Sequence, residues 1–381
     1  MSDDAIKEME RTLRGSPSDS VLRIRFAHTL LRIGRDREAL DAVDVAEIDH
    51  EHYEDAREIA DRLWREEIAR FERVDFLFPY DSRGGPAVDT TGRIGVFGMP
   101  SYHRVVDLAR REVIHHEPGR LNFPCPARGG IYFRVVHWNG SSRIGWARLD
   151  GRGEIEVGSR APRGDEELIE VSPAGDLIAV ARQLRRGQSF RILSLPSFEL
   201  VAKGPWEHGG VVLWESGHVV TPSRVVPWRE GVAAAFRDFT GNKLQKLGGS
   251  VVATDERSGI AIHDVVHGWS KRLESKRKVA LAHDGRTLRA STRSRTFEYE
   301  LDPETGDLFE RGFQSIPGHP LFHPGTDLYI PSEGSRVLSW DGQPVLELPA
   351  DARPFYWVMG GHGLLALRHG YELWRAPGDA G

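Results

Sequence analysis

The chain has 381 residues, more than one hydrophobic core ordinarily serves, so it holds a small module beside a large domain or a closed array of repeats. Hydrophobic residues make up 39% of it, which excludes a mainly disordered chain, and the net charge of −5 gives no overall attraction to nucleic acid or an anionic membrane. The single cysteine, Cys125, excludes an intramolecular disulfide and a cysteine-based metal site.

Charge and hydropathy vary along the chain. Residues 1–72 carry 19 acidic and 12 basic side chains, so the excess of negative charge lies in this segment. No apolar run approaches the length of about 18 residues that a membrane-spanning helix needs. The start, Met1-Ser2-Asp3-Asp4, lacks the basic and apolar segments of a secretory signal, so we expect a cytoplasmic protein.

Residues 1–73 are predicted to form a small all-α module of four helices, with almost no Gly or Pro. The first covers about 4–13; the second begins at Ser18 or Asp19 and ends at Gly34. The third begins near Asp36, and Asp49 is the predicted cap of the fourth. The residues expected to face inward recur at helical spacing: Leu22, Phe26, Leu30, Ile33, Ala39, Leu40, Val43, Ala46, Ala56, Ala60, Leu63, Trp64 and Phe71.

The segment 25–34, followed by Glu38-Ala39-Leu40, resembles a tetratricopeptide hairpin over about one repeat. In that family small residues such as Ala27 and Ala39 let two helices pack closely, and Gly34 would stand at the turn. The segment also resembles a short helical module found beside repeats in myxobacterial proteins, and the two resemblances stay open. A lone hairpin cannot bury its own apolar face, so the module must pack on the rest of the chain or on a partner.

From residue 74 onward the pattern is all-β, with short β-branched and aromatic runs between glycine turns. Intervals between the turns are 38, 45, 42, 42, 26, 40 and 38 residues, and a period near 40 predicts the blades of a β-propeller. The turns centre near Gly92, Gly130, Gly175, Gly217, Gly259, Gly285, Gly325 and Gly363.

The clearest blade covers 168–180, 190–195 and 199–201, and two more are predicted at 279–309 and 322–348. Ser172-Pro173-Ala174-Gly175 and the pair Trp340-Asp341 resemble WD40 repeats, although Gly318-His319 stands closer to that pair than the family has it. The resemblance implies a WD40-like propeller that joins larger assemblies.

Seven blades are predicted, with eight as the alternative, because the interval of 26 residues between Gly259 and Gly285 is too short for a blade. The last unit, 355–375, supplies about three strands, so 74–80 is expected to provide the fourth and close the propeller. The predicted domains are therefore a helical module at 1–73 and a propeller at 74–381.

Sequence motifs for phosphate-loop hydrolysis, serine hydrolysis and helical zinc sites are missing, and we assign no catalytic, cofactor-binding or metal-binding residue. Two histidine pairs have a spacing of four, which on a β-strand spans about 13 Å and cannot hold one metal ion. These pairs are His263 with His267 and His319 with His323. His115-His116-Glu117 is a better local cluster, though weak.

The remaining candidates each have a structural interpretation. Tryptophans with nearby histidines could contact a peptide, but packing is favoured: Trp206, Trp214, Trp228, His208 and His218. Two basic runs could contact phosphates, but solvated loops are favoured: Lys271, Arg272, Lys276, Arg277 and Lys278; Arg182, Arg185, Arg186 and Arg191. Acidic residues with possible acid–base roles are Asp165, Glu166, Glu167 and Asp255, although turn carboxylates usually serve the turn.

These features favour a non-catalytic interaction scaffold whose partner is another protein, held by the N-terminal helices and one propeller face. Two alternatives stay open. One is a hydrolase or lyase with its active site in the propeller channel, and the other is a nucleic-acid-binding subunit that uses the basic runs. We expect no membrane partner and no cofactor.

Overall fold

The computed structural model describes residues 3–377, except 17–18, 44–47, 49, 79–85, 99–100, 138, 162–165, 185–186, 233–241, 257, 283, 317–319, 333 and 369. The chain divides into two compact units. Unit 1 comprises Met1–Phe71, Lys278–Pro303 and Asp307–Ala350, and unit 2 comprises Glu72–Arg277, Glu304–Gly306 and Asp351–Gly381. Within the described residues, no helix has both the length and the apolar character needed to cross a bilayer. The predicted boundary between 73 and 74 stays a prediction.

Unit 1 contains four α-helices, as the sequence predicts: α1 (Asp3–Gly15), α2 (Ser20–Arg32), α3 (Asp36–Val43) and α4 (Tyr53–Ala69). Asp19 caps α2 by accepting a hydrogen bond from the backbone N–H of Leu22, and Gly34 follows that helix in the left-handed conformation with φ 75°. Ile33 was expected to face inward but is exposed. A 3₁₀ turn, His50–His52, leads into α4; the expected cap Asp49 lies outside the described residues, as do Ser18 and Ala46.

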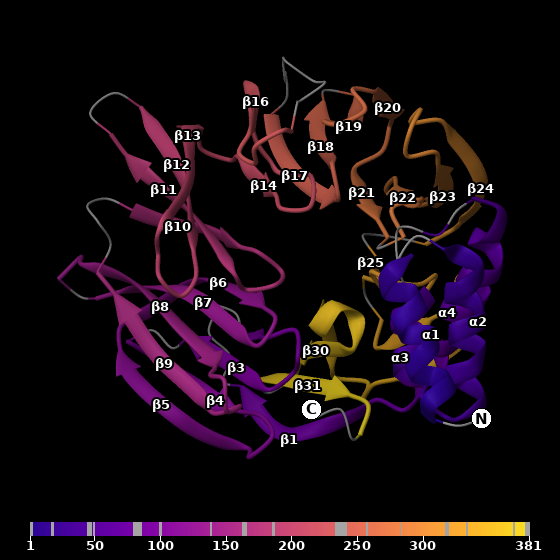
Figure 1. Ribbon diagram of the computed structural model, residues 1–381, viewed down its shortest axis with the longest axis horizontal. Helices are drawn as coiled ribbons and strands as arrows, with labels where there is room; N and C mark the ends of the chain where they lie inside the picture. Colours follow the sequence, from indigo (N-terminus) through magenta and orange to yellow (C-terminus); the bar gives the residue numbers. More distant parts are fainter. Residues whose placement is uncertain are drawn as a thin grey trace. The chain divides into compact units, whose positions relative to one another are not determined.

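The β region forms eight antiparallel sheets, each of strands consecutive in the chain except the last, and these sheets are the blades of a β-propeller (Figure 1). Seven have four strands, and the described part of the other has three. The six sheets of unit 2 are β2 (Ala87–Val88), β3 (Ile94–Gly98), β4 (Tyr102–Asp107), β5 (Glu112–Pro118); β6 (Arg120–Ala127), β7 (Gly130–Val136), β8 (Ser142–Leu149), β9 (Ile155–Arg160); β10 (Glu166–Val171), β11 (Leu177–Gln183), β12 (Gln188–Ser194), β13 (Leu200–Trp206); β14 (Val211–Leu213), β15 (His218–Thr221), β16 (Arg224–Pro227); β17 (Asn242–Gly248), β18 (Val251–Glu256), β19 (Gly259–Asp264), β20 (Ser270–Glu274); and β29 (Arg353–Val358), β30 (Gly363–Leu367), β31 (Tyr371–Arg375) with β1 (Glu72–Phe78).

The two sheets of unit 1 are β21 (Lys278–Leu281), β22 (Thr287–Ser291), β23 (Thr296–Leu301), β24 (Leu308–Gln314); and β25 (Leu321–Phe322), β26 (Tyr329–Ile330), β27 (Arg336–Leu338), β28 (Pro344–Glu347). All three blades predicted from the sequence are present. The prediction that 74–80 completes the last sheet is also confirmed as far as Phe78, because β1 pairs antiparallel with β31.

Eight blades, rather than the favoured seven, correct the sequence-based count. The first hairpin of the fifth sheet turns at Gly248-Gly249, between β17 and β18, whereas Gly259 begins the third strand of that sheet. The short interval before Gly285 therefore compared two different positions in the repeat. Measured from Gly249, the fifth sheet has an ordinary length.

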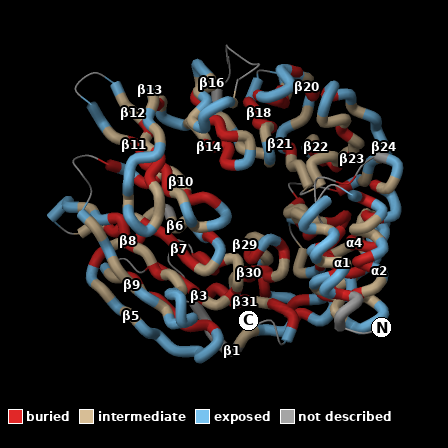
Figure 2. Tube along the Cα trace, in the orientation of Figure 1, coloured by how far each residue is buried: buried red, intermediate tan, exposed pale blue. Residues whose placement is uncertain are grey.

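Neighbouring sheets of unit 2 share apolar cores. One core joins the sheet of β29–β31 to that of β2–β5, through Leu365, Leu373, Phe97 and Val106 among others, and four more continue from sheet to sheet as far as β17–β20. The first strands are mainly buried, whereas the last strand of a sheet, such as β5 or β24, is mostly exposed (Figure 2). The apolar surface thus lies between the sheets, and the last strands provide most of the solvent-facing residues.

An aspartate turn recurs where the third strand of a sheet ends. Asp107, Asp150 and Asp264 each accept two backbone N–H hydrogen bonds of 2.7–3.0 Å on one carboxylate oxygen. Trp340-Asp341 occupies the same place after β27. The aspartate, rather than the tryptophan before it, is what these turns share, because its carboxylate satisfies backbone donors that the turn would otherwise leave unpaired.

Close packing of α4 on unit 1 requires a glycine in the β25–β26 turn. Trp64 of α4 is fully buried, and its ring lies 4.4 Å from that of His323. A Cβ atom on Gly325 would lie 2.8 Å from Nε1 of Trp64, closer than van der Waals contact permits.

We therefore expect Gly325→Ala to lower the free energy of unfolding by about 1–3 kcal/mol, the usual cost of overpacking a core. Denaturant titration followed by circular dichroism measures this. Gly151→Ala is the matched control, since a Cβ there meets no atom within 4 Å. Equal midpoints for the two variants would contradict this account of Trp64 packing.

Candidate functional site

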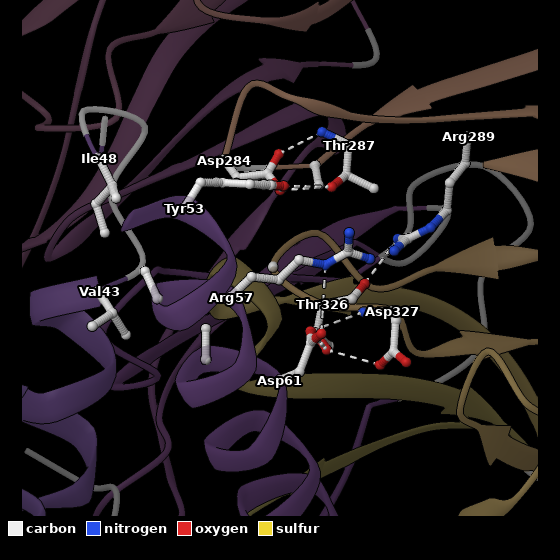
Figure 3. Close-up of a pocket in the computed structure, with 14 residues that line it drawn as sticks. Val43, Ile48, Tyr53, Arg57, Asp61, Asp284, Thr287, Arg289, Thr326 and Asp327 are labelled. Carbon is white, nitrogen blue, oxygen red and sulfur yellow. Dashed lines mark hydrogen bonds and ion pairs between the residues drawn. The ribbon is translucent and has the colours of Figure 1, made fainter. Parts of the chain in front are cut away.

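The richest cluster of ionisable groups in unit 1 lies where α4 packs on the sheets of β21–β24 and β25–β28 (Figure 3). Tyr53, at the start of α4, donates a hydrogen bond of 2.7 Å to Asp284 in the β21–β22 turn. The other carboxylate oxygen of Asp284 accepts the backbone N–H groups of Arg286 and Thr287, both at 2.8 Å. One carboxylate therefore holds both its own turn and the helix.

One turn further along α4, Arg57 reaches the second strand pair. Its guanidinium lies 2.9 Å from Glu298 of β23, whose other oxygen is 3.0 Å from Arg289 of β22. Arg289 also donates to the backbone carbonyl of Thr326, at 2.8 Å. The network links α4 to both sheets through buried charges of opposite sign.

Two more turns of α4 complete the contact. Asp61 accepts a hydrogen bond of 2.5 Å from the hydroxyl of Thr326, and Arg65 lies 2.6 Å from Asp327. Tyr53, Arg57, Asp61 and Arg65 recur every four residues, so they form one polar row along the helix. The sequence analysis missed this row because it followed only the apolar stripe, although a spacing of four among polar residues beside that stripe was available as a signal.

The contacts set the protonation of the carboxylates. Burial alone would raise the pKa of Asp284, but hydrogen bonds from Thr287, Tyr53 and Arg286 hold it below its ordinary value. Burial is likewise outweighed at Glu298, where Arg289 and Arg57 lower the pKa. At Asp61 burial and the nearby Asp327 prevail and raise the pKa.

The space between these residues is about 30 Å³, enough for one or two water molecules and too small for a metabolite. Asp284, Glu298 and Arg57 each already contact a polar partner of α4 or the sheets. The arrangement can fix the position of α4; it leaves no room in which these groups could act on a substrate.

Histidines singled out in the sequence separate into structural ones and one cluster. His263 is buried and hydrogen-bonded at 3.0 Å to both Thr254 and Ser270, and His267 lies 3.3 Å from Asp264. His323 accepts the backbone N–H of Gly325, and His319 lies outside the described residues. His115 and Glu117 do come together, with His103 from the neighbouring strand.

The tryptophan stretch is packing material, as favoured from the sequence. Trp206 and Trp214 are buried in the core between the third and fourth sheets of unit 2, and Trp228 packs against it, 5.8 Å from the ring of Trp214. His218 is buried beside Ser216, whereas His208 is exposed.

The basic and acidic candidates pair with one another. Glu166 is buried between Arg160 and Arg191, and Glu167 contacts Arg134. In the other basic run, Arg272 lies 2.9 Å from Glu256. Exposed members include Arg277, Lys278 and Asp255, while Asp165, Arg185 and Arg186 lie outside the described residues.

Cys125 is no candidate nucleophile. Burial, with a smaller contribution from Glu170, raises the pKa of its thiol to about 12, so the reactive thiolate is disfavoured near neutral pH.

No protein-family model matches this chain, and no curated protein matches its sequence. Solved structures do resemble it. The β-propeller domain of the Trilobed protease from Pyrococcus furiosus is 11% identical with a TM-score of 0.41, covering 77% of this chain and 93% of its own. The Dos1 propeller is 13% identical with a TM-score of 0.45, covering 79% and 95%. A functionally unknown protein from Desulfotomaculum acetoxidans is 11% identical with a TM-score of 0.41, covering 75% and 99%. Likenesses at this level carry nothing about activity or partners.

The electrostatics of the α4 contact predict a pH dependence. Because the pKa of Asp284 is lowered on folding, its ionised form stabilises the fold above about pH 4, and this contribution is lost as pH falls through the folded-state pKa. Asp284→Asn should therefore cost about 1–3 kcal/mol of unfolding free energy at neutral pH. The difference from wild type should shrink as the pH is lowered through the acid range.

Urea denaturation at several pH values tests this prediction. Asp55→Asn, on the exposed side of α4, is the control and should follow wild type at every pH. A deficit of Asp284→Asn that is constant with pH would show that the charge of Asp284 does not contribute.

Proposed function

We propose that this chain is a non-catalytic protein-interaction scaffold within a larger assembly, a WD40-like propeller with a tetratricopeptide-like helical module. The observation that carries the proposal is a set of exposed aromatic residues at the edge of one sheet of unit 1. Phe309 and Phe313 of β24 expose 59% and 49% of their surface. Large apolar side chains left in solvent commonly mark a surface that another protein covers.

The surroundings of these two residues suit a specific partner. The ring of Phe313 lies 5.7 Å from that of Phe297 on β23, which in turn stacks at 6.3 Å on Tyr299. Arg295 lies over Phe313 at 4.9 Å. Aromatic residues with arginine are enriched at the centres of protein interfaces, because they bury much area at little entropic cost.

The edge of β24 is protected from indiscriminate strand pairing. A bulge interrupts its register with β23 opposite Glu298 and Tyr299, and Gly312 lies at the bulge. Glu310 and Arg311 are exposed beside the aromatics, and Arg311 is held by Glu54 of α4 at 2.6 Å. Bulges and charges are the usual means of preventing aggregation at an edge strand, so the exposed aromatics favour a selective contact.

The helical module would contribute through the faces that do not contact the sheets. The polar row of α4 is engaged with Asp284, Glu298 and Asp327, whereas Val21 and Ile33 at the two ends of α2 are about 40% exposed. We propose a protein partner for these surfaces and a cytoplasmic location.

Affinity capture from the native host tests the proposal, with the full chain beside Phe309→Ser/Phe313→Ser. We expect wild type to retain a partner that the double variant loses, by at least about tenfold in recovered amount, since each aromatic anchor contributes on the order of 1–2 kcal/mol. Leu184→Ser, which removes a similarly exposed apolar residue in unit 2, should retain the partner.

Two results would count against the scaffold proposal. One is that wild type retains no protein above an unrelated control; the other is that the double variant and Leu184→Ser behave alike. Melting curves of all three proteins establish that loss of binding is not loss of folding.

A further inference from the structure

Three side chains able to bind a metal ion meet on the first sheet of unit 2. His103 lies on β4, and His115 and Glu117 lie on β5. One ligand-type atom from each lies within 4.8 Å of the other two. Two come from one strand at a spacing of two, which places them on the same face, and His103 pairs directly with Glu117 in the antiparallel register.

His103 is prepared to offer one particular nitrogen. It is almost fully buried, and its Nδ1 lies 3.4 Å from the backbone carbonyl of Gly119. Its Nε2 faces the other way, 3.9 Å from the carboxylate of Glu117. A backbone carbonyl that takes the proton of one ring nitrogen and leaves the second free is the arrangement that holds metal-binding histidines in place.

His115 offers its Nε2 from the opposite side of Glu117. That nitrogen lies 3.5 Å from the same carboxylate oxygen, is inaccessible to solvent, and has no hydrogen-bond partner among the described residues. A buried nitrogen without a hydrogen bond costs free energy unless another ligand satisfies it. His137, close to Gly119, also has a buried Nε2 without a hydrogen bond in the described structure.

We propose that His103, His115 and Glu117 form a binding site for a divalent transition-metal ion of the zinc class. Two imidazoles and one carboxylate are the donors that zinc and its neighbours prefer over magnesium and calcium. Ligand atoms around tetrahedral zinc lie roughly 3.3 Å apart, so the observed 3.5 and 3.9 Å require only a small contraction.

The position of the site indicates how an ion would enter and what it would do. His115 and Glu117 are about one-third exposed, so the site opens to solvent on one side while His103 closes the other. A bound ion would tie the solvent-facing strand β5 to β4. Since the unfolded chain has no such site, the ion should stabilise the folded state.

The test uses the full chain, freed of metal with a chelator and titrated with Zn²⁺ by calorimetry. Wild type should bind one equivalent. His115→Gln and Glu117→Gln should each weaken that equivalent on the order of 100-fold or more, because each removes a direct ligand. His116→Gln is the matched control: His116 lies between them on β5 but packs its ring on Tyr102, 4.4 Å away, so its loss should leave zinc affinity unchanged.

A second measurement does not depend on substitutions. X-ray absorption of the wild-type protein with one equivalent of Zn²⁺ should show two imidazoles and an oxygen ligand, and the melting temperature should rise with added zinc in wild type and His116→Gln alone. The proposal is overturned if wild type binds no stoichiometric zinc, if the spectrum shows fewer than two imidazoles, or if His115→Gln and His116→Gln bind equally well.

Discussion

The pairing of β1 with β31 is the constraint on which the β region depends. Residues 353–375 supply only three strands, and the fourth comes from residues 72–78, almost 300 residues earlier in the chain. Glu72 pairs with Arg375 and Phe78 with Tyr371, and Arg73 lies 3.5 Å from Glu372. Without β1, strand β31 would expose its backbone donors and acceptors, and the core that it shares with β2–β5 would lose one wall. Such a contact between distant segments costs much chain entropy, so the apolar burial between successive sheets must offset it.

The polar row of α4 solves a different problem, that of placing a helix on the ends of sheets. Turns expose backbone groups and carboxylates rather than a smooth apolar surface, so an apolar helix face alone would leave Asp284 and Glu298 buried without partners. Tyr53 and Arg57 supply those partners at the cost of their own desolvation. Buried ion pairs contribute little net stability but tolerate only one geometry. The row therefore fixes the register of α4, while Ala56, Ala60 and Trp64 provide the apolar burial.

Turn chemistry was readable from the sequence, and pairing between strands was not. Glycine turns located all the blades, and the deficit of one strand after residue 355 indicated the role of β1. The blade count failed because Gly259 and Gly249 look alike as turn residues, and only the strand pairing shows which of them begins a blade. Aspartates that end the third strands, such as Asp107 and Asp264, would have given the period more reliably, since the turn requires their carboxylates. His103 could not be joined to His115 because their separation of 12 residues becomes a contact only through the bulged register of β4 and β5.

The two proposed sites share a structural logic. Inner strands of the sheets must stay apolar, since both of their faces pack against neighbours, and β3 is buried at every residue. Last strands have one edge without a partner strand, so their side chains can vary without opening the core. Phe309 and Phe313 lie on the last strand of one sheet, and His115 and Glu117 lie on the last strand of another. In both cases the neighbouring third strand supplies the residue that completes the group, Phe297 in one and His103 in the other. A propeller can thus acquire a binding site by changing its last strands alone, while the aspartate turns and the apolar first strands keep the blades in place.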